Sequence, residues 1–196
     1  GDTLLLDDGR IVLWVDSVEG SEVHCRVVVG GDLSDRKGLN RQGGGLSAPA
    51  LTQKDREDIK VSAEIQADYL AVSFPRTAED IEEARRLMLE AGGYSGIVAK
   101  IERADCLENI EDLIEASDAI MIARGDLAVE IGFERLSEIQ EEILWICEAA
   151  HVPVIWATQV LESLNKSGIA TRSEVTDAAR AAHAECVMLN KGKYLL

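Results

Sequence analysis

Five short apolar runs, spaced about 22–34 residues apart, are the feature that most constrains how this chain can fold. Each run is five or six residues long, which suits a strand and is too short for a buried helix. The runs are continuously apolar and do not alternate with polar residues, so they predict strands of a parallel sheet that is buried on both faces. They span residues 69–74, 97–101, 119–123, 153–157 and 186–190.

Segments with helical character separate these runs. Residues 53–66 follow Thr52 and Asp55, a pair typical of a capping box, and residues 78–91 are amphipathic and stop at Gly92-Gly93. Further helical candidates are residues 107–116, 134–150 and 172–183. Strands alternating with helices predict an α/β fold whose parallel sheet is covered on both faces, either a (β/α)8 barrel or an open doubly wound sheet. Five strands are too few to close an eight-stranded barrel.

Residues 1–41 follow a different pattern. Short β-branched runs are interrupted by Asp7-Asp8-Gly9, Glu19-Gly20 and Gly30-Gly31, which predicts three strands of a small antiparallel meander or of a piece of a small barrel. Residues 40–49 contain three consecutive glycines and are expected to link this region to the repeat. The link is either a flexible tether or a hinge beside a site, and the sequence leaves both open.

Charge and cysteine usage limit the partners and the compartment. The chain of 196 residues has 20 Lys and Arg against 36 Asp and Glu, a net charge of −16, which repels nucleic acids and anionic membrane surfaces. No run of 18 apolar residues is present, so we expect no membrane span. Four dispersed cysteines and three histidines without zinc spacing predict buried free thiols in a reducing, cytoplasmic setting.

Polar residues gather where the predicted strands end, which is where sites lie in both α/β architectures. Lys100 and Glu102 share one face of the second strand because strand side chains alternate. Further polar groups follow the other runs: Ser73, Arg124-Gly125-Asp126, Thr158 and Asn190-Lys191. Each motif alone is common and is usually a solvated strand end or a surface turn. Their placement at one sheet edge is what indicates a site.

The residue types indicate a particular chemistry. Glu102 and Asp126 could hold a hard divalent cation beside the positive charge of Lys100, which would stabilise a transferring phosphoryl group or an enolate. A short helix starting after Gly125 would point backbone amides at a carboxylate or phosphate. Thr158 could relay a proton. Ser73 is expected only to form hydrogen bonds at its strand end.

At these residues the sequence resembles the pyruvate kinases, with motifs in family order over essentially the whole chain. The central signature is similar to Ala99-Lys100-Ile101-Glu102 and to the stretch from Met121 through Arg124-Gly125-Asp126 to Glu130. Further matching motifs are residues 157–163, 171–175, 36–40, 51–55, 1–9 and, similar to a bacterial branch, 43–47 and 71–76. The resemblance implies that residues 1–41 are the rear part of a small β lid domain. It also implies that residues 42–196 are about strands four to eight of a (β/α)8 barrel.

The resemblance also carries roles onto matching positions. Lys100 and Thr158 would be catalytic, and Glu102 and Asp126 would ligate Mg²⁺ or Mn²⁺. The implied reaction transfers phosphate from phosphoenolpyruvate to ADP in glycolysis and yields pyruvate and ATP. The ligands for K⁺ would lie outside this segment, and the family's assembly implies a homo-oligomer, a tetramer. The substrate would bind to Ala123, Arg124, Gly125, Asp126 and Thr158, and the nucleotide would lie near Lys37 and Asn40.

One position and two short stretches depart from the family pattern: Ala128 replaces a glycine, residues 190–193 replace an acidic Ser-(Gly/Ala)-Glu-Thr motif, and residues 167–170 replace a Pro-rich stretch. These departures leave two alternatives to a working kinase. One is a catalytically degenerate copy that acts as a binding or assembly module. The other is a different metal-dependent barrel enzyme that acts on pyruvate or an enolate and needs neither Lys37 nor a lid.

Overall fold

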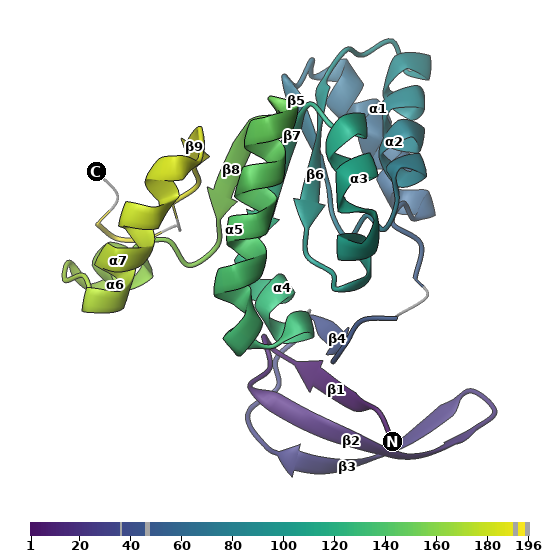
Figure 1. Ribbon diagram of the computed structural model, residues 1–196. Helices are drawn as coiled ribbons and strands as arrows, with labels where there is room; N and C mark the ends of the chain where they lie inside the picture. The colour runs from purple at the N-terminus through teal and green to yellow at the C-terminus, as the bar shows by residue number, and fades with distance from the viewer. Residues whose placement is uncertain (36, 46–47, 190–191, 195–196) are drawn as a thin grey trace.

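A computed structural model describes residues 1–35, 37–45, 48–189 and 192–194. Its described residues form two sheets, one antiparallel and one parallel (Figure 1). The expected Asn190 and Lys191 at the end of the last apolar run lie outside the described residues, as do Leu46 and Ser47 after the three glycines.

The antiparallel sheet has the order β3-β2-β1-β4. Its strands are β1 (Thr3–Leu6), β2 (Ile11–Glu19), β3 (Glu22–Val29) and β4 (Leu39–Arg41). The turn between β1 and β2 has left-handed backbone at Asp7, Asp8 and Gly9, residue types that tolerate this conformation. The prediction of three strands missed β4, which pairs with β1 and includes the first two residues assigned to the linker.

The parallel sheet has the consecutive order β5-β6-β7-β8-β9. A doubly wound sheet reverses its strand order at a switch point, and these five strands show no reversal. The five predicted strands are confirmed, although β9 is shorter than the apolar run at its position. The strands are β5 (Tyr69–Val72), β6 (Gly96–Ile101), β7 (Ala119–Ala123), β8 (Val154–Ala157) and β9 (Cys186–Val187).

The predicted helices are present, and local sequence explains where they begin. Thr52 and Asp55 form the expected capping box of α1, and Thr171 and Glu174 form another at α7. Two helices were not predicted as periodic segments: α4, whose start after β7 was only considered, and α6. The helices are α1 (Gln53–Glu64), α2 (Ala78–Glu90), α3 (Ile110–Ala116), α4 (Arg124–Ile131), α5 (Phe133–Ala150), α6 (Glu162–Ser167) and α7 (Arg172–Arg180), with short 3₁₀ turns η1 (Asp105–Asn109) and η2 (Ala181–His183).

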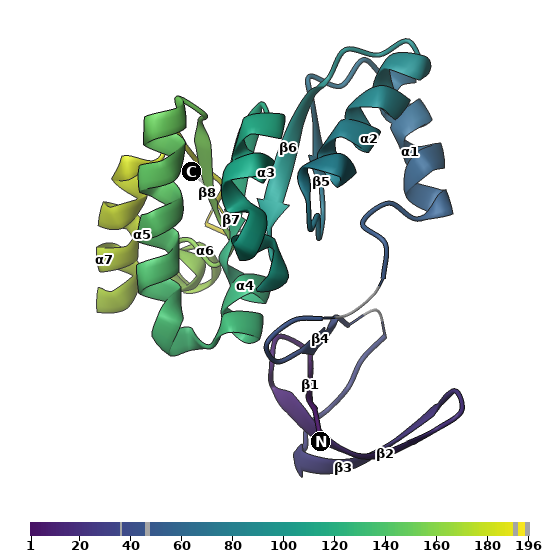
Figure 2. The same cartoon turned by 45° about the vertical axis from the view of Figure 1, so that its right-hand side comes forward.

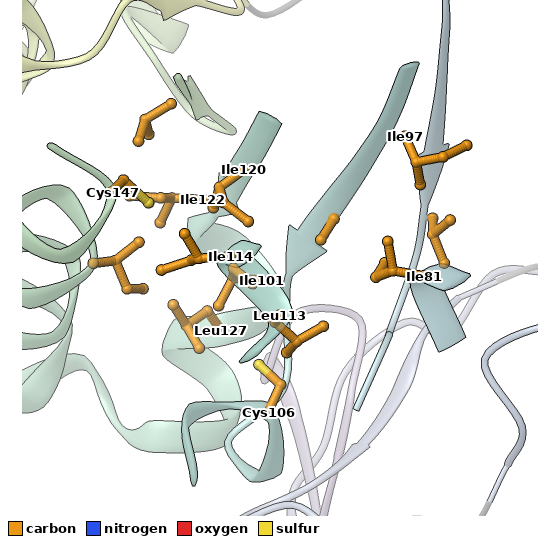
Figure 3. Close-up of a cluster of buried hydrophobic side chains, with 14 of the residues drawn as sticks. Ile81, Ile97, Ile101, Cys106, Leu113, Ile114, Ile120, Ile122, Leu127 and Cys147 are labelled. Atoms are coloured by element: carbon orange, nitrogen blue, oxygen red, sulfur yellow. The ribbon is translucent and has the colours of Figure 1, made fainter. Parts of the chain in front are cut away.

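The main core lies between one face of the parallel sheet and the helices. Ile97, Ile101, Ile120 and Ile122 from the strands pack with residues of α2, α3, α4 and α5 (Figure 3). The opposite face has a small separate cluster of Val98, Ala119, Met121 and Ala157, with Ile155 packed against it. Among the described residues, the helices of the main core therefore pack against one face of the parallel sheet, and the opposite face carries the small apolar cluster.

The antiparallel sheet lies beyond the C-terminal ends of the parallel strands, beside α4 (Figures 1 and 2). The contact is specific: the Gly43 amide donates to the Glu130 carbonyl at 2.9 Å, and the Asn40 side chain donates to the Glu130 carboxylate at 3.4 Å. The antiparallel sheet is thus attached to the edge where sites form in such folds.

The four cysteines are free thiols, as predicted, but only two of them are buried. Burial raises the pKa of both Cys106 and Cys147 to about 12, so these two are inert structural thiols. Cys25 and Cys186 are exposed, which corrects the expectation that all four are buried. No described helix is long and apolar enough to cross a bilayer.

We expect Ile122→Ala to lower the free energy of unfolding by about 2–5 kcal/mol, because Ile122 is fully buried and its loss leaves a cavity. Urea unfolding followed by circular dichroism measures the change. The matched control is Ile169→Ala, where the side chain is 74% exposed and the expected loss is at most about 0.5 kcal/mol. Equal losses at the two positions would show that this core is not the one that stabilises the fold.

Candidate active site

A lysine and a glutamate form the centre of the candidate site, at the end of β6. The Lys100 ammonium lies 2.7 Å from Oε1 of Glu102, so the alternation that puts both residues on one face also brings their charges together. Lys100 also donates to Oγ of Ser73 at 2.8 Å, and the Phe74 amide donates to Oε2 of Glu102 at 2.9 Å. The end of β5 therefore fixes both partners. Ser73, expected only to form hydrogen bonds at its strand end, forms one with the lysine.

The two charges differ in their access to solvent. The Glu102 side chain is 3% exposed, whereas that of Lys100 is 24% exposed. Burial raises the pKa of Glu102 despite the opposing attraction of Lys100, and the negative charge of Asp126 raises it further. The Glu102 carboxylate is thus buried, and the positive charge of Lys100 offsets only part of the cost of burying it. The Lys100 ammonium is partly exposed and can still reach a ligand.

Asp126 brings the second carboxylate to this place from the first turn of α4. Burial raises its pKa, the charge of Asp8 in the antiparallel sheet raises it further, and Lys100 and Asn40 oppose the rise. Two desolvated carboxylates beside each other are an oxygen donor set that suits a hard divalent cation. The described residues contain no group of three or more His, Cys, Asp or Glu side chains arranged as a metal site. A metal here would thus depend on Glu102, Asp126 and non-protein ligands.

The start of α4 supplies backbone amides, as the sequence suggested. Ala123 is the N-cap, and the Gly125 amide donates to Oγ1 of Thr158 at 2.9 Å. A side-chain oxygen therefore already lies against an amide of the first helical turn. The Arg124 side chain is buried at this edge and does not face a ligand with its charge free, because it donates to the carbonyls of Ala157 and Thr158 at the end of β8.

Thr158 lies in a strained turn directly after β8. Thr158, Gln159 and Leu161 have φ angles of 63°, 53° and 49°, a region that β-branched and bulky residues rarely adopt. Phe74, after β5, has φ 54°. Such strain persists only where surrounding contacts enforce it, and it gathers at functional sites.

The residues expected on the nucleotide side already have partners in this structure. Lys37 pairs with Asp7 at 2.6 Å, and its hydrogen bond holds the pKa of Asp7 below the ordinary value. Asn40 is buried and donates to Glu130, and its side chain lies close enough to Asp126 to oppose the rise in the pKa of that carboxyl. Asn40 therefore joins the antiparallel sheet to α4, the helix that carries Asp126.

Glu130 is a site residue that the sequence reasoning missed. It lies one turn after Asp126 on α4, is 3% exposed, and accepts from the Ala104 amide at 2.9 Å as well as from Asn40. Burial raises its pKa. A buried glutamate four residues after a candidate ligand on one helix was the available signal.

The three glycines of the linker have a structural reason. Gly43, Gly44 and Gly45 have φ of 83°, 77° and 85°, a left-handed backbone that other residues avoid. Hydrogen bonds hold them, from Gly43 to the Glu130 carbonyl and from Arg41 to the Gly44 carbonyl at 3.0 Å. These contacts favour the hinge interpretation over a flexible tether.

A cavity lies close to this edge of the parallel sheet. It has a volume of about 580 Å³ and is lined in part by Asn40, Leu51, Arg103 and Glu130, and also by Ser73 and Phe74, the two residues that bond to Lys100 and Glu102. Its size suits a small molecule.

Ala128, which replaces a family glycine, lies inside α4 with helical backbone and is buried, so an alanine is accommodated there without a left-handed conformation.

Comparison with known proteins identifies what this chain is similar to. The family model described as "Pyruvate kinase, barrel domain" matches residues 1–194. The chain is 51% identical over 195 residues to "Pyruvate kinase" of Buchnera aphidicola and 51% identical over 195 residues to "Pyruvate kinase II" of Salmonella typhimurium. It is 40% identical over 200 residues to "Pyruvate kinase" of Mycobacterium intracellulare. These matches cover 97–99% of the chain but only 41–42% of each relative.

We expect Glu130→Gln to change the pH dependence of stability. Because the folded pKa of Glu130 is raised, wild-type stability falls as pH rises from the ordinary glutamate pKa through the folded one. The variant lacks this titration, so its stability relative to wild type should increase between acidic and neutral pH. Urea unfolding at a series of pH values measures the difference.

The control for this prediction is Glu174→Gln, which should give the opposite sign. Hydrogen bonds from Thr171 and Ser163 lower the pKa of Glu174, so its stabilisation is complete above the ordinary pKa and is lost as pH falls through the folded one. The Glu174 variant should therefore lose stability relative to wild type as pH rises. The same trend in both variants would contradict the assignment.

Proposed function

The chain belongs to the pyruvate kinase family, and from this membership together with the geometry of the site we propose that it carries the centre for transfer of a phosphoryl group from phosphoenolpyruvate to ADP. The single observation that carries the proposal is the Lys100–Glu102 pair, with Asp126 and the Gly125 amide beside it. Because the chain spans about two fifths of the length of its relatives, the activity proposed is that of the full-length protein.

The proposed architecture is part of a (β/α)8 barrel with part of a lid. The consecutive parallel order β5 to β9, with the core helices on one face, supports an arc of about strands four to eight of a barrel. We assign residues 42–196 to this barrel portion and residues 1–41 to the lid. Asn40 and Gly43, which contact Glu130, would then lie at the hinge between them.

The proposed reaction has two steps. The bond between the enol oxygen and the phosphorus of phosphoenolpyruvate breaks, and a bond forms from that phosphorus to a terminal phosphate oxygen of ADP. The enol oxygen keeps the electron pair, and C3 of the enolate then takes up one proton to give pyruvate. The Lys100 ammonium, partly exposed and fixed by Ser73 and Glu102, would stabilise negative charge on the phosphoryl group and the enolate.

Glu102 and Asp126 are proposed to hold Mg²⁺ or Mn²⁺. The donor set fits, because burial raises the pKa of both carboxyls and the charge of Asp126 raises the pKa of Glu102 further. A divalent cation held by Glu102 and Asp126 would supply positive charge to offset that of the transferring phosphoryl group. Without it, Lys100 balances these carboxylates only in part, as the raised pKa values indicate.

The start of α4 and the turn after β8 are proposed to hold the substrate and serve the proton step. The substrate carboxylate would bind to amides of residues 123–126, of which that of Gly125 already donates to an oxygen at 2.9 Å. Thr158 would lie near C3 and relay the proton. Lys37 and Asn40 would approach the nucleotide, Lys37 by exchanging its pair with Asp7 for a phosphate.

Three wider assignments are proposed from the family alone. These are K⁺ as a second cation with ligands outside this chain, a homo-oligomeric assembly, and a cytoplasmic location. The net charge of −16 supports small-molecule partners over nucleic acids and membrane surfaces.

We expect Lys100→Met to reduce turnover at least about 1,000-fold while phosphoenolpyruvate binding changes less than about threefold, since charge stabilisation in the transition state is lost and the carboxylate site remains. Pyruvate formation from phosphoenolpyruvate and ADP, with Mg²⁺ and K⁺, measures turnover in the full-length protein. Lys60→Met, at an exposed position of α1, is the matched control and should be unaffected.

The outcomes of this assay separate the candidate functions. Normal turnover in Lys100→Met would remove Lys100 from the catalytic centre. No turnover in a folded wild-type protein that still binds Mn²⁺ would instead support a degenerate copy. Activity on pyruvate without ADP binding would support another enolate enzyme.

We also expect Glu102→Ala and Asp126→Ala each to weaken Mn²⁺ binding at least about tenfold, because each removes an oxygen ligand. Titration followed by electron paramagnetic resonance measures the affinity. Asp112→Ala on α3 removes a carboxylate away from the site and should leave the affinity unchanged. Unchanged titrations of both site variants would refute the metal assignment.

A further inference from the structure

We propose that the buried side chain of Arg124 is a positioning residue that holds the strained turn after β8 and so fixes the Thr158 hydroxyl against the start of α4. The catalytic consequence rests on the proposed function, in which Thr158 serves the proton step. The geometric part of the inference stands on this chain's own contacts.

The turn needs support from outside itself. Thr158 and Gln159 follow one another in the left-handed region, with φ of 63° and 53°, and Leu161 has φ 49°. Neither threonine nor leucine favours this backbone, and no glycine relieves it. Such a turn persists only where neighbouring groups enforce it.

The Arg124 guanidinium contacts the turn at its two leading carbonyls. Nε donates to the Ala157 carbonyl at 2.9 Å, and Nη2 donates to the Thr158 carbonyl. The planar fork of arginine can bind two consecutive carbonyls at once, whereas the single ammonium of lysine is a point charge without that geometry. These two bonds fix the orientation of the peptide groups at which the chain leaves β8.

The guanidinium is itself held in place from two other sides. Nη1 pairs with Asp177 of α7, and the guanidinium carbon lies 4.7 Å from the centre of the Trp156 ring. Arg124 is only 8% exposed, so its charge requires this partner. The α7 helix has no buried residue of its own, and the ion pair ties it to the site.

Main chain and side chain act on Thr158 together. The residue after Arg124 is Gly125, whose amide donates to Oγ1 of Thr158 at 2.9 Å. The Arg124 side chain thus holds the carbonyl of Thr158, while the adjacent amide holds its hydroxyl. If the guanidinium is lost, the turn can relax and the hydroxyl moves away from the amide.

The test compares Arg124→Lys with Arg85→Lys in the full-length protein. Arg85 is a matched control, since it also donates to an aspartate and to a backbone carbonyl, Asp118 and Ala116, each at 2.8 Å, but at the opposite end of the strands. Two quantities are measured: hydrogen exchange of the Gly125 amide by NMR, and exchange of pyruvate methyl hydrogens with deuterated solvent. Mn²⁺ affinity is measured beside them.

Arg124→Lys should accelerate exchange of the Gly125 amide at least about tenfold and slow pyruvate methyl exchange about 100-fold, the loss typical of a small misplacement of a reacting group. Mn²⁺ affinity should change less than about threefold, because the carboxylates are not touched. Arg85→Lys should change none of the three by more than about threefold.

The amide measurement does not depend on catalysis. If wild type itself shows no methyl exchange, the proposed function fails, and the amide result still decides the positioning role. An unchanged exchange rate of the Gly125 amide in Arg124→Lys overturns the proposal. An equal acceleration of that exchange in Arg85→Lys overturns it as well. If Arg124→Lys fails to fold, Asp177→Asn is used in its place, because it removes the ion pair that holds the guanidinium but keeps the bonds from Arg124 to the two carbonyls. An unchanged exchange rate of the Gly125 amide in Asp177→Asn also overturns the proposal.

Discussion

The site depends on the burial of charge at the carboxyl ends of parallel strands. Within the central strands of the parallel sheet the backbone groups pair with the neighbouring strands, and β7 is buried along its whole length. Charged groups can enter only where a strand ends, and there Glu102, Asp126 and Glu130 are desolvated together. Lys100, Asn40 and backbone amides oppose that cost without removing it. The pKa values of all three carboxyls are raised because the nearby positive charge and hydrogen bonds do not fully offset the cost of burying negative charge. This uncompensated negative charge is the physical reason for expecting a cation at this edge.

The same edge also joins the two sheets. Asn40 from β4 donates to Glu130, and the left-handed Gly43 that follows donates to the Glu130 carbonyl. Movement of the antiparallel sheet would therefore act on α4, the helix that also carries Asp126. Lys37, paired with Asp7 in the same sheet, is carried with it.

Much of the fold follows from local sequence. The five apolar runs, the capping box at Thr52 and the stop at Gly92-Gly93 depend on neighbours within a few residues, and the structure agrees at each. The errors came where tertiary contacts decide. β4 is three residues long and forms because β1 offers it a partner, and the exposure of Cys25 and Cys186 depends on what packs beside them. Neither property can be read from a short window of sequence.

For the site, the sequence by itself determined which residues share a face and an edge: alternation along β6 fixes Lys100 and Glu102, and the end of β7 fixes Asp126. It also carried the family signature. Only the tertiary structure decided which of these groups are desolvated, that Ser73 and Phe74 from β5 orient the pair, and that the Arg124 side chain turns away to brace Thr158. The physical reason is that periodicity along a strand or helix fixes the direction of a side chain. Desolvation, pairing and backbone strain instead depend on groups that are distant in sequence, and folding alone brings those together.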